Sequence, residues 1–163
     1  IYKDRMAFYN KKAIVIAGVN LSPNDIEHGI LRKSRWIYGL GYIRKWFPGE
    51  FEKKMRVKKL DSRIHFALNC GAKSCPPILF YETRKIDKQL DEATIGFLQH
   101  NWRIEEKTLI VTKLFSWYRG DFGSKKDVIQ FLVDYHILAD PPGFKTFTYD
   151  DYDWQLELDM FKK

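Results

Sequence analysis

Both cysteines of the chain, Cys70 and Cys75, lie within the short segment 63–78, which closes on a pair of prolines. The apolar run before them alternates its side chains and predicts a strand at 63–69. A strand that delivers a thiol to a tight turn suits nucleophilic chemistry. The same pattern suits a small disulfide loop or half of a metal site. The segment therefore restricts the fold and leaves three chemical interpretations open.

The alternation of side chains along the predicted strand favours one of the two cysteines as the nucleophile. In a strand at 63–69, His65 and Asn69 share one face, and Cys70 falls on the opposite face. Cys75 lies five residues further on and can curl back over either face. We therefore predict Cys75 as the nucleophile and His65 as its general base, with Asn69 a possible orienting group for the base. The backbone amides of 71–74 could supply the oxyanion donors.

A second candidate group lies on a predicted helix at 23–32. Ser22 is a favourable N-cap, and Asp25 follows three residues later, close to a capping box. At 100° per residue Glu27 falls among apolar side chains, whereas His28 points to the opposite side. A carboxylate on a buried face requires a partner. Glu27 is therefore either the group that orients His65 or binds substrate, or a carboxylate paired for structural reasons.

Other interpretations of these residues remain open. A Cys70–Cys75 disulfide would close a small loop and would persist only in an oxidising compartment. The two cysteines with His65 and His28 could offer four metal ligands, but their spacing is not that of a standard zinc motif. His65 could also be a core histidine whose ring nitrogens are satisfied. We expect no metal and no cofactor.

The rest of the pattern predicts an α+β fold in a single domain, 1–163, with a small, mostly antiparallel sheet and packed helices. Asp121 lies in an aromatic segment expected to be core, where it would cap or pair. The predicted elements are a strand at 12–18, helices at 42–47, 50–54, 84–99 (capped by Thr83), 114–123 and 125–136, a hairpin at 102–104 and 108–112, a loop at 141–143 and a strand at 146–157.

Positive charge is concentrated in the first part of the chain. Residues 1–60 hold 14 Lys/Arg against 5 Asp/Glu, whereas 61–163 hold 14 against 16. Within this basic region, 33–60 forms an aromatic-rich insertion. Basic and aromatic residues together are typical of a nucleic-acid platform or of a membrane-surface segment. The simpler interpretation, which we favour, is a solvated helical insertion whose aromatic side chains pack on the body of the protein.

Length and hydropathy add few restrictions. A chain of 163 residues can bury a sizeable core without disulfides, which leaves the cysteines available for chemistry. No apolar run is long enough to predict a transmembrane segment. The chain opens at Ile1 rather than Met, and we expect upstream residues to have been removed.

Four segments together resemble the bacterial DUF547 domain. They are DIEHGILR at 25–32, RIHFALNCGAKSCPP at 63–77, LFSWYRGDFG at 114–123 and YDW at 152–154. The resemblance implies that the characteristic polar positions are Glu27, His28, His65, Cys70 and Cys75. It also implies a periplasmic or secreted bacterial protein, and a likeness to papain- or transglutaminase-like cysteine enzymes.

The chain departs from that family pattern in two ways. The family usually carries an upstream helical segment rich in Asn, Ala and Tyr, and here the chain begins after it. An upstream segment or a partner chain would then complete the fold. The insertion 33–60 is longer than the usual spacer and could be a lid or a docking surface.

These observations favour a cysteine-dependent hydrolase or acyl-transferase that acts on an amide- or thiol-containing peptide. We predict Cys75, His65 and Glu27 as catalytic residues. The residues expected to bind substrate are His28, Asn69, Cys70, Lys73 and Ser74. The alternative is a non-catalytic envelope binding module, in which the cysteines are structural and the 33–60 surface recognises an anionic partner.

Overall fold

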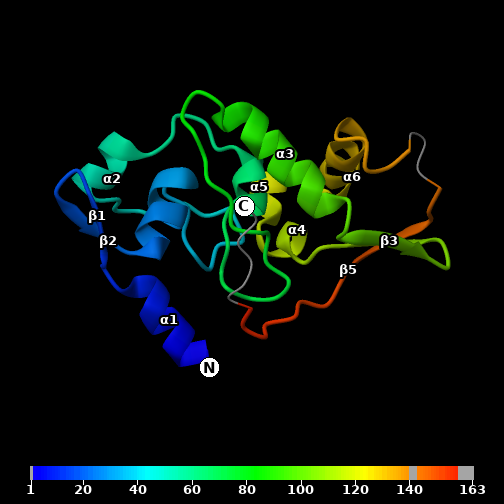
Figure 1. Cartoon of the computed structure of the whole chain (residues 1–163), viewed down its shortest axis with the longest axis horizontal. Helices are drawn as coiled ribbons and strands as arrows, with labels where there is room; N and C mark the ends of the chain where they lie inside the picture. Colours follow the sequence, from blue (N-terminus) through cyan, green and yellow to red (C-terminus); the bar gives the residue numbers. More distant parts are fainter. Residues whose placement is uncertain (1, 140–142, 158–163) are drawn as a thin grey trace. The chain divides into compact units, whose positions relative to one another are not determined.

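The computed structural model describes residues 2–139 and 143–157. The chain forms two compact units, Ile1–Asp61 and Ser62–Lys163, and each is described by itself. In Figure 1 the first unit runs from blue to cyan, and the second from green to red. Helices and two small sheets make up the described chain, which confirms the predicted α+β class.

The first unit opens with helix α1 and continues into a two-stranded antiparallel hairpin. The hairpin turns at Ala17 and Gly18, whose positive φ values of 49° and 78° reverse the chain. The predicted strand at 12–18 is therefore real but shorter, and a second strand follows it. The elements of this unit are α1 (Tyr2–Asn10), β1 (Ile14–Ile16), β2 (Val19–Leu21), η1 (Asp25–Leu31) and α2 (Glu50–Met55).

Helix η1 begins at the predicted capping box. The amide of Asp25 donates to Ser22 Oγ at 3.1 Å, and the Ser22 amide donates to Asp25 Oδ2 at 2.9 Å. However, η1 is a π-helix, in which the Arg32 amide reaches back five residues to the Glu27 carbonyl at 2.8 Å. Each residue then turns the chain by less than 100°. The projection that directed His28 away from the apolar face is therefore wrong: His28 is buried, and the Glu27 side chain is 22 % exposed.

The insertion 33–60 contains one helix, α2, which confirms the prediction at 50–54. The second predicted helix, at 42–47, is wrong. Arg35 and Arg44 instead form an antiparallel bridge, because the chain reverses through a turn in which Gly41 has a φ of 87°. The prediction that the aromatic side chains of the insertion pack on the body also fails at Trp46 and Phe47, which are 85 % and 93 % exposed.

The second unit combines five helical segments with a three-stranded sheet in the part of the chain that the structure describes. Strand β4 lies in the centre, antiparallel to β3 and parallel to β5, so two of the three strand pairings in the described chain are antiparallel. The elements are η2 (Ser62–Phe66), α3 (Ile86–Leu98), β3 (Trp102–Glu105), β4 (Thr108–Val111), α4 (Leu114–Trp117), α5 (Arg119–Phe122), α6 (Lys125–Asp134) and β5 (Thr146–Tyr149).

Several local predictions in this unit are confirmed. The predicted hairpin is present as β3 and β4, and Glu106 and Lys107 adopt positive φ in its turn. The helix predicted at 125–136 is present as α6, and the single helix predicted at 114–123 is divided into α4 and α5. Helix α3 begins at Ile86 without the predicted Thr83 cap, and β5 ends at Tyr149 rather than at 157. Most of the loop predicted at 141–143 lies outside the described residues.

The strand predicted at 63–69 is wrong, since this segment forms the 3-10 helix η2. Ile64, His65 and Phe66 are consecutive and all buried, and a half-exposed strand would not bury three in a row. Helix η2 contacts α3, and Phe66 enters the core of the unit. The fully buried core side chains around it include Leu98, Leu109, Phe115 and Leu132.

A polar network joins η2, α3 and the residue after α6. Asp91 Oδ1 accepts from Arg63 Nη1 at 2.7 Å and from the Tyr135 hydroxyl at 2.7 Å. Partial burial, followed by the hydrogen bond to Asp91, raises the pKa of Tyr135 to about 12. An unfolded tyrosine ionises near pH 10. The stabilisation is therefore present below pH ~10 and is lost as the pH rises toward the folded pKa.

Replacing Tyr135 with Phe should remove this alkaline loss of stability. We expect the urea midpoint of the wild type to fall more between about pH 9 and about pH 11 than that of Tyr135→Phe. Over this pH range the wild type should lose less than about 1 kcal/mol more free energy of unfolding than Tyr135→Phe, because the network is partly exposed. Tyr38→Phe, at a 59 % exposed tyrosine, is the control. Equal slopes in all three proteins would contradict the pKa shift.

Candidate functional site

Cys70 and Cys75 form a disulfide, with their Cα atoms 6.1 Å apart. The sequence left three interpretations of this segment open: a nucleophile, a disulfide loop or half of a metal site. The structure shows the disulfide. Gly71 adopts a φ of 78°, and the Cys75 amide donates to the Ala72 carbonyl at 2.9 Å, so the chain turns tightly between the two sulfurs. In this state neither cysteine offers a thiol.

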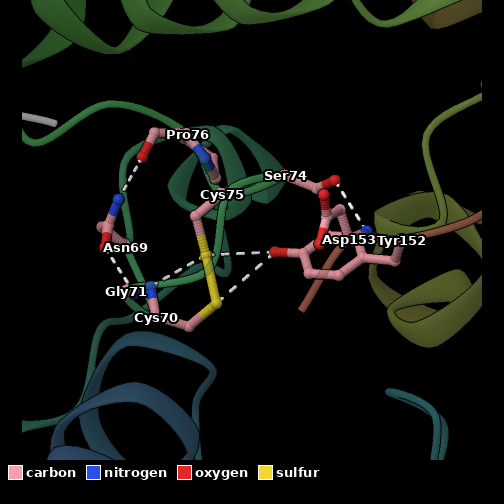
Figure 2. The surroundings of a disulfide bond; sticks show 8 residues. All are labelled: Asn69, Cys70, Gly71, Ser74, Cys75, Pro76, Tyr152 and Asp153. Atoms are coloured by element: carbon pink, nitrogen blue, oxygen red, sulfur yellow. Dashed lines mark hydrogen bonds between the residues drawn. A yellow bond between two sulfur atoms is a disulfide. The ribbon is translucent and has the colours of Figure 1, made fainter. Parts of the chain in front are cut away.

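Tyr152 places its hydroxyl against both sulfurs (Figure 2). The oxygen lies 3.0 Å from Cys75 Sγ and 3.4 Å from Cys70 Sγ. The Cys70 amide also donates to Cys75 Sγ at 3.0 Å. Two hydrogen-bond donors therefore converge on the sulfur of Cys75. Tyr152 was not predicted as a site residue, and its presence in a motif of the family resemblance is the signal that could have indicated it.

The C-terminal segment lies along the disulfide loop and holds its backbone. The Lys73 amide donates to the Gln155 carbonyl at 2.8 Å, and the Ser74 amide donates to the Asp153 carbonyl at 3.2 Å. Ser74 Oγ accepts from the Asp153 amide at 2.9 Å, and Lys73 Nζ lies 3.7 Å from the Asp153 carboxylate. Lys73 and Ser74, predicted to bind substrate, here bind the chain itself.

Asn69 braces the two ends of the loop (Figure 2). Its Nδ2 donates to the Pro76 carbonyl at 2.5 Å, and its Oδ1 accepts from the Gly71 amide at 2.6 Å. Together with the bonds of Lys73 and Ser74, three of the four amides at 71–74 therefore have acceptors within the chain. The geometry of the oxidised loop does not support an oxyanion role for these three.

His65 is paired with Asp121, which lies 56 residues later in α5. The distance from His65 Nε2 to Asp121 Oδ2 is 2.9 Å, and the two side chains are 1 % and 0 % exposed. The Tyr118 ring stacks on the imidazole, with the ring centroids 3.7 Å apart. The prediction that Asp121 caps or pairs is confirmed as pairing. No pattern within 63–78 could have indicated a partner so distant in sequence.

The pairing fixes the chemistry of the imidazole. A carboxylate only accepts hydrogen bonds, so Nε2 of His65 carries the proton that it donates to Asp121. In the neutral ring Nδ1 is then the nitrogen that can take up a proton. A carboxylate at Nε2 also stabilises the imidazolium that results. His65 and Asp121 therefore have the arrangement of a general base with its orienting group.

The first unit holds another buried polar group, built on η1. Arg32 Nη1 lies 2.6 Å from His28 Nδ1, and both side chains are buried. Because the guanidinium can only donate, Nδ1 accepts and the His28 proton resides on Nε2. That nitrogen faces Glu27 Oε1 at 3.8 Å. Sequence analysis missed Arg32, although it lies four residues after His28 and directly follows η1.

A comparison with models of protein families places the chain in a family. The model described as a protein of unknown function, DUF547, matches residues 2–98. The chain belongs to the DUF547 family. Searches of curated proteins and of solved structures found no match.

The DUF547 match covers both the η1 group and the disulfide loop with His65, whereas Asp121 and Tyr152 lie beyond it. Glu27 and His65 belong to different units, so the role of Glu27 as an orienting group stays a prediction. Within residues 2–139 and 143–157, no three His, Cys, Asp or Glu side chains are grouped to hold a metal ion. No helix among those residues is long and apolar enough to cross a membrane.

Proposed function

We propose that this DUF547 protein is a cysteine-dependent hydrolase or acyl-transferase that becomes active when its disulfide is reduced. The buried His65–Asp121 pair supports this proposal most directly, because it supplies a base that is already oriented. Cys75 is favoured over Cys70 as the nucleophile. Two donors, the Cys70 amide and the Tyr152 hydroxyl, approach its sulfur and would stabilise a thiolate there.

The reaction begins with reduction of the disulfide by a dithiol, which gives up two electrons and two protons and becomes a disulfide itself. Cys75 then loses its proton to His65 Nδ1, and the thiolate attacks the carbonyl carbon of an amide or thioester substrate. His65 returns the proton to the departing amine or thiol, leaving an acyl group on Cys75. Water or a second nucleophile attacks that thioester, and the thiol is restored.

The remaining predicted residues have supporting roles in this proposal. We propose Glu27 as a substrate-binding or orienting carboxylate, as predicted, and His28 as a residue that binds substrate. Asn69, Cys70, Lys73 and Ser74 line the reduced loop around Cys75. The substrate is an amide- or thiol-containing peptide. A bacterial periplasmic or secreted location would suit the proposal, because a disulfide persists in an oxidising compartment until a dithiol reaches it.

Thiol alkylation tests the proposal. Cys70→Ser leaves Cys75 as a thiol without a reductant, and it should react with iodoacetamide at neutral pH about tenfold faster than free cysteine. Adding His65→Ala should bring that rate down to the rate of free cysteine, because the base is lost. Cys75→Ser, which leaves Cys70 alone, is the matched control.

Circular dichroism verifies that each variant is folded before its rate is read. If Cys70→Ser reacts no faster than Cys75→Ser, Cys75 is not an activated nucleophile. If His65→Ala leaves the rate unchanged in a folded protein, His65 is not its base.

One observation favours a second candidate function, the non-catalytic binding module. Trp46 and Phe47 are exposed within the basic insertion 33–60, which would serve as a docking surface for an anionic partner. Such binding should weaken with added salt and survive Cys75→Ser. Arg44→Glu with Lys54→Glu should abolish retention on a polyanion column. Equal retention of this variant and the wild type would rule out the surface.

A further inference from the structure

The most exposed aromatic pair of the described chain lies on a bend just before α2. Trp46 and Phe47 are 85 % and 93 % exposed, and Pro48 and Gly49 lead from them into the helix. A side chain of this size that is exposed to water forgoes the favourable free energy that its burial would supply. Single exposed apolar residues are common, but two large adjacent ones at a bend indicate a contact surface.

Further apolar side chains are exposed on the same segment. A hydrogen bond from the Trp36 amide to the Ile43 carbonyl, 2.9 Å long, holds the two arms of the turn side by side. The exposed side chains of this segment are Trp36, Tyr38, Leu40, Tyr42 and Ile43, at 41–59 %. The patch therefore combines aromatic rings with aliphatic chains.

The charge around this patch is strongly positive. Residues 33–60 include nine Lys/Arg and two Asp/Glu. Both acidic residues are engaged, since Glu52 pairs with Lys45 at 3.0 Å and Glu50 pairs with Lys53 at 2.6 Å. Arg44 lies two residues before Trp46, and Lys54 lies on α2; both are exposed. The patch would thus face a partner with a net negative surface.

We infer that this surface docks on an anionic lipid bilayer, with Trp46 and Phe47 inserted at the headgroup level. The inference rests on the second function proposed above and names its partner. Trp and Phe beside a basic face are typical of segments that lie in the membrane interface, and nearby Lys and Arg are attracted to anionic headgroups. The aliphatic side chains decide against single-stranded nucleic acid, because Leu40 and Ile43 cannot stack on bases as aromatic rings do.

Vesicle co-sedimentation of the full chain tests the inference. Binding to phosphatidylcholine vesicles that contain phosphatidylglycerol should exceed binding to phosphatidylcholine alone, and should weaken as salt is added. Trp46→Ser with Phe47→Ser should weaken binding by more than about tenfold, because the two rings that would insert into the bilayer are lost. Arg44→Glu with Lys54→Glu should weaken it by about tenfold or more. Phe80→Ser, at a 79 % exposed residue of the second unit, should bind as the wild type does.

The outcomes separate this inference from the function on which it rests. If the wild type is retained on the polyanion column but does not bind vesicles, the docking surface stands and the lipid partner is wrong. Tighter binding to a single-stranded oligonucleotide than to vesicles would also overturn the lipid partner. Equal vesicle binding by the Trp46→Ser/Phe47→Ser variant and by the wild type would overturn the insertion. If the wild type is neither retained on the polyanion column nor bound to vesicles, both the docking surface and its lipid partner are wrong.

Discussion

Replacing Asp121 with Ala should lower the free energy of unfolding by about 1–3 kcal/mol, the cost of leaving a buried hydrogen-bond donor without its acceptor. The carboxylate is fully buried and lies 2.9 Å from His65 Nε2. Its removal leaves the imidazole N–H buried next to a cavity that the surrounding aromatic rings cannot fill. Urea unfolding at neutral pH measures the loss.

Asp87→Ala is the control, because the Asp87 carboxylate also accepts a hydrogen bond, from Arg63, but its side chain is 84 % exposed. That change should lower stability by less than about 1 kcal/mol. If Asp121→Ala is no more destabilising than Asp87→Ala, the His65–Asp121 pair does not hold this part of the protein together.

Asp121→Asn separates the structural role from the chemical role. The amide oxygen can still accept from His65 Nε2, so the tautomer is kept and the loss of stability should be about 1–2 kcal/mol. The negative charge that would stabilise an imidazolium is gone. If His65 activates Cys75, alkylation of the Cys70→Ser protein should slow when Asp121→Asn is added, although the protein stays folded.

The features that could be predicted from the sequence depend on neighbouring residues. The capping box of η1 joins Ser22 to Asp25, three residues apart, and the β3–β4 turn needs only Glu106 and Lys107 in left-handed conformations. Such contacts join residues that are only a few positions apart, so the residue types in a short segment determine them. The capped start of η1 and the hairpin were therefore predicted at the right places.

The failures lie where tertiary packing overrides local preference. The run at 63–69 alternates like a strand, yet the core takes up Ile64, His65 and Phe66 together and the chain winds into η2. Glu27 and His28 were projected on an α-helix, and the larger number of residues per turn in the π-helix changed the direction of both side chains. The periodicity of apolar residues alone does not distinguish a strand from a short buried 3-10 helix, or an α-helix from a π-helix.

About half of the candidate site could be predicted from the sequence. The segment 63–78 correctly indicated His65 and the two cysteines as the residues of interest. Their partners come from elsewhere in the chain: Asp121 lies 56 residues beyond His65, and Tyr152 lies 77 residues beyond Cys75. No rule of spacing within one segment can connect residues so far apart, and the structure alone brings these pairs together.

Replacing Phe66 with Ala should lower the free energy of unfolding by about 3–5 kcal/mol, since the ring is fully buried and the cavity cannot collapse. Its centroid lies 5.6 Å from that of Phe97, 5.8 Å from Phe115 and 5.6 Å from Phe122. Phe66→Leu keeps most of the volume and should be less destabilising, by under about 1.5 kcal/mol. Phe80→Ala, at an exposed phenylalanine, should stay within about 0.5 kcal/mol of the wild type.

The Phe66 cavity should also reach the buried pair, because the Phe122 ring contacts both Phe66 and His65, at centroid distances of 5.6 and 5.4 Å. Phe66→Ala would let Phe122 shift and loosen the hold on His65 and on Asp121. Combined with Asp121→Ala, it should therefore be non-additive by about 0.5–3 kcal/mol, as expected of residues that share a neighbour. Losses that simply add would mean that the aromatic core and the His65–Asp121 pair are independent, and that Phe122 does not couple them.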